Sequence, residues 1–93
     1  MLDIEEGQEF CGDLGELVID PETNRRRVRT VPGQEFPGGI FVECSKAARN
    51  RQPLHTIFKM NVGVSRKPAG RLYAHTLKKH ELLTVKEWDT VYG

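Results

Sequence analysis

Apolar and polar residues alternate with period two over much of this chain. The most regular stretch is Thr56–Ser65, in which one face carries only apolar side chains: Phe58, Met60, Val62 and Val64. Strict alternation of this kind is typical of a half-buried strand. We therefore expect a strand here, a turn at Arg66–Gly70 and a returning strand over Arg71–Leu77.

Three further strands are predicted in the first half of the chain, at Gly15–Asp20, Arg25–Val31 and Ile40–Cys44. The segment Asp20–Asn24 favours a tight turn, because its proline presets φ and its Asp and Asn tolerate corner conformations. The first two strands therefore form a hairpin. Two prolines and three glycines make Pro32–Gly39 a loop.

The pattern changes period at the C-terminus. Thr84 and Glu87 have the spacing of a capping box, in which each side chain satisfies an exposed amide at a helix start. A short helix is predicted from about Val85 to Tyr92, with an apolar stripe that plugs an open end of the sheet. A single helical turn is also expected at Lys46–Arg49.

These elements predict a mainly β fold: five short strands in an antiparallel sheet curled into a small barrel, with a short C-terminal helix. A chain of 93 residues is one domain, residues 1–93. Residues 1–13 are acidic and broken by two glycines, and are expected to form an arm or irregular lead-in. The expected core contains Val18, Phe41 or Val42, Phe58, Met60, Val62, Leu72, Ala74 and Trp88.

Charge is strongly segregated, which the net charge of +1 conceals. Residues 1–22 contain eight acidic residues and no Lys or Arg, whereas residues 45–80 contain nine Lys or Arg, all three His and no acidic residue. A basic segment of this kind presents a positive field to a polyanion or to an acidic protein surface. Two hypotheses follow: a nucleic-acid-binding module, or a protein-interaction or self-assembly module in which acidic and basic segments meet in cis or in a homo-oligomer.

The solvent face of the last two predicted strands supplies the candidate contact residues. It gathers cations around one aromatic ring, as do small barrels that bind single-stranded nucleic acid. The alternative is an ordinary solvent-exposed sheet face, on which such cross-strand pairs only keep the surface soluble. The candidate nucleic-acid-binding residues are Lys59, Arg66, Lys67, Arg71, Tyr73 and His75.

A second basic cluster lies on the predicted strand Arg25–Val31. Three of its arginines share one strand face, and arginine forks match phosphate oxygens. The interpretation that we favour is that Arg25, Arg27 and Arg29 pair with the acidic side chains of the facing strand: Glu16, Asp20 and Glu22.

No motif for hydrolytic or phosphoryl chemistry is present, so we expect no enzyme and no cofactor. Cys44 ends an apolar strand, which is typical of a structural thiol, and a zinc site built from Cys44, His55 and His75 has no local support. No apolar run is long enough to span a membrane. The cysteines, Cys11 and Cys44, come without an export signal, which indicates free thiols in a small cytoplasmic protein.

Overall fold

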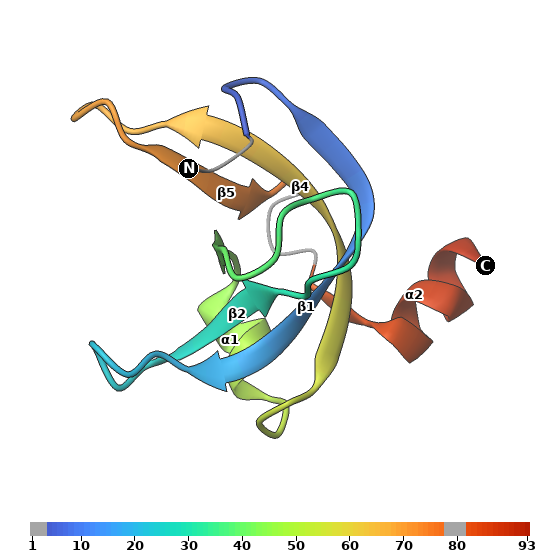
Figure 1. The fold of residues 1–93 in the computed structure, drawn as a ribbon. Helices are drawn as coiled ribbons and strands as arrows, with labels where there is room; N and C mark the ends of the chain where they lie inside the picture. The colour runs from blue at the N-terminus through green and yellow to red at the C-terminus, as the bar shows by residue number, and fades with distance from the viewer. Residues whose placement is uncertain (1–3, 78–81) are drawn as a thin grey trace.

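The computed structural model describes residues 4–77 and 82–93. Five strands close into a barrel in the order β1-β2-β3-β5-β4, and β1 pairs with β4 to complete the ring (Figure 1). A sixth, two-residue strand pairs with β4. The elements are β1 (Glu9–Ile19), β2 (Arg26–Thr30), β3 (Phe41–Glu43), α1 (Lys46–Asn50), β4 (Ile57–Arg66), β5 (Leu72–Thr76), β6 (Leu83–Thr84) and α2 (Val85–Tyr92). The prediction of a β-rich barrel with a short C-terminal helix is confirmed.

One pairing departs from the antiparallel expectation. Strands β3 and β5 run parallel, with Val42 opposite Ala74 and Glu43 opposite His75, while the other four joints of the ring are antiparallel. Strand directions cannot alternate at every joint of a closed ring of five, because five is odd. Closure therefore requires at least one parallel pair, and in this barrel that pair is β3 and β5.

The N-terminal segment belongs to the barrel to a greater extent than expected. Strand β1 begins at Glu9, so the lead-in is shorter than residues 1–13, and Ile4 is buried in the core. Further along β1, a Cβ on Gly15 would lie 2.6 Å from the Val28 Cγ1 and 2.7 Å from the Met60 Cε. The barrel interior therefore closes tightly around this glycine.

The core is the set of inward-facing side chains of the strands, together with one loop residue. Phe36, from the loop before β3, is fully buried and packs edge-on against the Phe10 ring at 4.9 Å between centroids. Leu72 is only partly buried at the edge of this core. The buried core cluster contains Ile4, Leu17, Val28, Phe36, Val42, Ala48, Phe58, Met60, Val62, Val64, Ala74 and Leu82.

Helix α2 has the predicted bounds and the predicted capping box. The Thr84 amide donates to the Glu87 carboxylate at 2.8 Å, and the Glu87 amide donates to the Thr84 hydroxyl at 3.2 Å. The helix does not plug the barrel, because it packs against the outside of β4 and β6 and projects away from the strands (Figure 1). Within residues 4–77 and 82–93, no helix is long and apolar enough to cross a membrane.

Candidate functional site

The outward-facing side chains of β2, β3 and β5 form one continuous surface, which we call the β2–β3–β5 face. Its inner side is defined by Val28, Val42 and Ala74, which are completely buried and lie opposite one another across the three strands. Because strand side chains alternate, their neighbours point outward. The face comprises Arg27, Arg29, Phe41, Glu43, Tyr73 and His75, with Lys67 and Arg71 contributed by the β4–β5 turn.

Arg27 is held above the Phe41 ring, with its guanidinium carbon 4.3 Å from the ring centroid. Its Nη1 also lies 3.5 Å from the Asp20 carboxylate, which is almost fully buried. A hydrogen bond from the Glu22 amide, assisted by the nearby Arg27 charge, lowers the pKa of Asp20 from its ordinary value. Asp20 therefore stays ionised and orients the guanidinium over the ring.

A second cation lies over the second ring of the face. The Lys67 ammonium is 4.6 Å from the centroid of the Tyr73 ring and 2.7 Å from a carboxylate oxygen of Glu43. The register that sets Val42 opposite Ala74 also brings Phe41 beside Tyr73. Two aromatic side chains from different strands, each with its own cation, therefore stand next to each other.

A groove of about 360 Å³ lies against both rings. Phe41 and Tyr73 both line it, and Arg27 and Arg71 add guanidinium groups to its wall. The remaining lining residues are Ile4, Gly39, Ile40, Glu43, Leu72 and Ala74.

The structure brings five of the six predicted contact residues together at the β4–β5 hairpin and separates the sixth. Lys59 lies seven residues before Arg66 on β4, which is about 23 Å of strand at about 3.3 Å per residue. Its ammonium is 5.6 Å from the centroid of the Trp88 ring of α2. The hairpin group is Arg66, Lys67, Arg71, Tyr73 and His75.

His75 is held in place by two hydrogen bonds on the outer side of the barrel. Its Nε2 is 2.7 Å from the Ser65 hydroxyl, and its Nδ1 donates to the Thr76 carbonyl at 3.2 Å. The imidazole also lies beside the Tyr73 ring, with 5.3 Å between ring centroids. His75 therefore supports the Tyr73 ring from the side.

Sequence reasoning missed Phe41 as a site residue and left open whether it or Val42 enters the core. Two neighbours on a strand point to opposite faces, so only one of them can be buried. The structure buries Val42 completely and turns Phe41 outward. The predicted strand was too short for the alternation of its residues to show which of these two side chains faces inward.

The expected pairing of the β2 arginines with β1 carboxylates holds for one pair. Arg27 contacts Asp20, but the Glu16 carboxylate instead accepts from the His55 Nδ1 at 2.7 Å. In the part of the chain that the structure describes, Arg25 and Arg29 have no carboxylate within ion-pair distance. Arg29 is exposed on the β2–β3–β5 face and Arg25 on the β1–β2 turn.

The acidic N-terminal segment meets the basic segment at two described points, the Glu16–His55 contact and a Glu6–Arg66 ion pair. Glu6 lies 3.0 Å from the Arg66 Nε, and both side chains are about half exposed. Backbone hydrogen bonds from Gly7 to Val64 and from Val64 to Gln8 hold the segment along β4. Residues 78–80 of the basic stretch, His80 included, lie outside the described residues.

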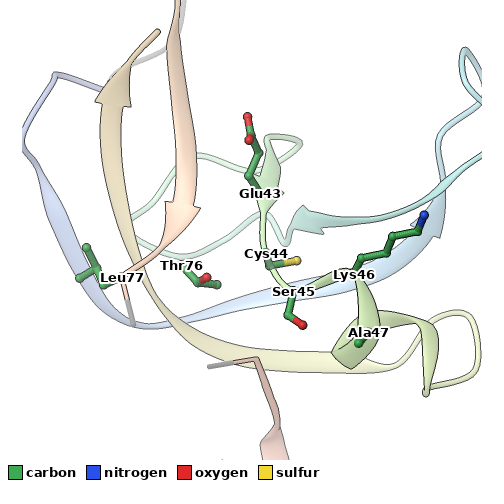
Figure 2. Close-up of a pocket in the computed structure, with 7 residues that line it drawn as sticks. All are labelled: Glu43, Cys44, Ser45, Lys46, Ala47, Thr76 and Leu77. Atoms are coloured by element: carbon green, nitrogen blue, oxygen red, sulfur yellow. The ribbon is translucent and has the colours of Figure 1, made fainter. Parts of the chain in front are cut away.

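A larger hollow, about 780 Å³, opens where β3 and β5 end, and Figure 2 shows its seven lining side chains. The Ser45 hydroxyl there accepts from the Ala48 amide at 3.2 Å and caps α1. Burial raises the pKa of the Cys44 thiol above its ordinary value, so the thiol stays protonated. None of the seven described lining residues is therefore an activated nucleophile.

Metal ligation finds no support in the residues that the structure covers. Among them, no three His, Cys, Asp or Glu side chains converge to hold an ion. Cys11 and Cys44 are both free thiols, the first exposed and the second partly buried.

A buried carboxyl lies away from the β2–β3–β5 face. Asp13 is 5% exposed and shares a separate hollow with Glu35 and Gln34. Burial, reinforced by the Glu35 charge, raises the pKa of Asp13 to about 6. Because folding shifts the pKa of this carboxyl, the group makes the stability of the protein depend on pH.

Comparison of the chain with protein-family models, with curated proteins and with solved structures found no match. The geometry of the β2–β3–β5 face is therefore the basis for assigning a function.

Proposed function

We propose that this chain is a non-enzymatic module that binds single-stranded nucleic acid on the β2–β3–β5 face. The observation that carries the proposal is the groove in which Phe41 and Tyr73, from two different strands, each contact a cation. Aromatic rings stack on unpaired bases, and neighbouring cations follow the phosphates. The sequence alone offered only one such ring, which is a weak platform.

A single strand fits this face better than a duplex does. Bases reach a ring only when they are unstacked, and duplex reading needs a helix or β-ribbon to enter the major groove. Helix α1 has five residues and α2 projects from another part of the barrel (Figure 1). No described helix is therefore set beside the groove to read duplex DNA.

The arrangement of the strands gives additional support by analogy. A five-stranded barrel in this order, with the β3–β5 pair parallel and a helix between β3 and β4, has the topology of the OB-fold. Such barrels bind oligonucleotides and oligosaccharides on the β2–β3 side, between the β1–β2 and β4–β5 loops. Fold alone does not assign function. Here both loops carry cations, Arg25 on one and Lys67 and Arg71 on or beside the other.

Self-assembly through the acidic and basic segments is the second candidate. It has less support, because Glu6, Glu16 and Asp20 already pair with basic side chains of the same chain. Size-exclusion chromatography at low and high salt tests it. A dimer that dissociates in salt, with no nucleic-acid binding, would favour this candidate over the first.

Fluorescence anisotropy with labelled single strands and duplexes of about ten nucleotides tests nucleic-acid binding. We expect the single strand to bind more tightly. Three neutralised phosphates give a slope of about −2 for log K against log salt concentration. If neither probe binds at low salt, the proposal is overturned.

Matched variants locate the site. Replacing Tyr73 or Phe41 by Leu keeps apolar volume but removes the ring, and we expect each change to weaken binding at least fivefold, because stacking is worth about 1–3 kcal/mol per base. Arg71→Gln should weaken binding and flatten the salt slope by about 0.7. Lys59→Gln is the control. It also removes one positive charge, but near Trp88 and outside the groove, so it should change affinity by less than about twofold.

A further inference from the structure

Glu43 is the only acidic side chain among the described residues that line the groove. It also borders the hollow in Figure 2, where its carboxylate points away from Cys44 at the end of β3. A carboxylate repels phosphate, so it weakens a surface that only tracks a backbone. Its position between two ring–cation pairs indicates contact with a different part of the ligand.

The carboxylate forms a donor–acceptor pair with Lys67, at 2.7 Å between Oε2 and Nζ. The two side chains are 46% and 43% exposed, so both remain open to a ligand. A carboxylate has about four acceptor positions and an ammonium three donors, and their mutual contact uses one of each. The remaining acceptors and donors lie side by side next to the Tyr73 ring.

This pair complements the Watson–Crick edge of guanine, which presents two adjacent N–H donors and one carbonyl acceptor. The carboxylate accepts from both donors, and the ammonium donates to the carbonyl. Thymine and uracil present a single donor between two acceptors, so they leave the carboxylate partly unsatisfied. Unpaired bases are commonly read on this edge while they stack on aromatic side chains.

We propose that Glu43 and Lys67 read the edge of a base stacked in the groove, and that they favour guanine over thymine or uracil. This inference rests on the proposed single-strand binding. It goes further by assigning base preference to one ion pair and backbone affinity to the surrounding arginines. If Glu43 served only as a surface ion-pair partner, the chain would bind all bases alike.

The test compares two labelled strands in anisotropy titrations of the full chain. One strand is all thymine, about ten nucleotides long, and the other has two central guanines, too few to form a quadruplex. We expect the guanine-containing strand to bind about tenfold more tightly, since a good bidentate contact discriminates between bases by about this factor. Equal affinities would overturn the inference and leave the proposed function standing, whereas binding of neither strand would overturn both.

Two variants separate base reading from a general charge effect. Glu43→Gln should reduce the guanine preference to within about twofold, while the affinity for the thymine strand stays equal or increases. Glu6→Gln is the matched control, because Glu6 is also an exposed carboxylate paired with a cation of the β4–β5 hairpin but does not line the groove. It should change both affinities equally. A preference that survives Glu43→Gln, or disappears equally in Glu6→Gln, would contradict the assignment.

Discussion

Replacing Asp13 by Asn should stabilise this protein at neutral and alkaline pH. Asp13 is 5% exposed, and within the described residues its Oδ2 has no hydrogen-bond partner. Burial, together with the Glu35 charge, raises its pKa from an ordinary value of 3.8 to about 6. The folded state therefore holds the Asp13 proton more tightly than the unfolded chain does.

The sign of the pH dependence follows from this raised pKa. The contribution of Asp13 to stability is fully present below about pH 3.8, and it is lost as pH rises through about 6. Above that pH, the ionised carboxylate costs about 3 kcal/mol, because each pKa unit corresponds to about 1.4 kcal/mol. An Asn side chain has the shape of the protonated acid and never ionises, so it avoids this cost.

The measurement is urea denaturation of both proteins, followed by the fluorescence of the single tryptophan between about pH 4 and pH 8. The free energy of unfolding of Asp13→Asn relative to wild type should rise by about 2.5 kcal/mol over this range, because the rest of the total of about 3 kcal/mol is lost below about pH 4. Because any pH-independent packing change cancels in the comparison, only ionisation contributes. Thr90→Ala, at an exposed position of α2, changes no titratable group; it is the control and should give a flat difference. A flat difference for Asp13→Asn as well would show that folding does not raise the Asp13 pKa.

Three further outcomes are expected. Gly15→Ala should destabilise the barrel by about 1–3 kcal/mol in denaturation experiments, because the added Cβ would lie 2.6 Å from the Val28 side chain; an unchanged unfolding midpoint would count against the packing described. Thr84→Ala should cost about 1 kcal/mol through loss of the α2 cap, measured by the same fluorescence. In alkylation followed by mass spectrometry near neutral pH, Cys11 should react before Cys44, since burial raises the pKa of the Cys44 thiol and Cys11 is exposed; equal rates would contradict this order.

The local patterns of the sequence were sufficient to find nearly every element of the fold. Alternation predicted Thr56–Ser65, observed as Ile57–Arg66, and the capping box predicted α2 with its observed bounds. Signals of this kind act over a few residues, so they do not depend on the rest of the chain. Residues 9–13 were misjudged, because two glycines suggested an irregular segment where β1 in fact continues through a bulge between Phe10 and Asp13.

The candidate site was predictable only in part. The sequence joined Arg71 and Tyr73 to the β4–β5 hairpin, because a hairpin fixes which of its residues are neighbours. It also added Lys59, which shares their strand face but lies far along a strand that curves around the barrel. Two side chains on the same strand face need not be close together when the strand curves around a closed barrel.

Local sequence patterns are thus enough to predict the strands, the C-terminal helix, the apolar face of β4 and the separation of acidic from basic segments. Which segments become neighbours depends on the tertiary structure. Closing five strands forces at least one parallel joint, and in this barrel that joint sets β3 beside β5. It brings Arg27 and Phe41 next to Tyr73, which follows them by more than thirty residues in the chain. Contact between such distant segments depends on the closure of the whole barrel, for which no local pattern of residues carries a signal.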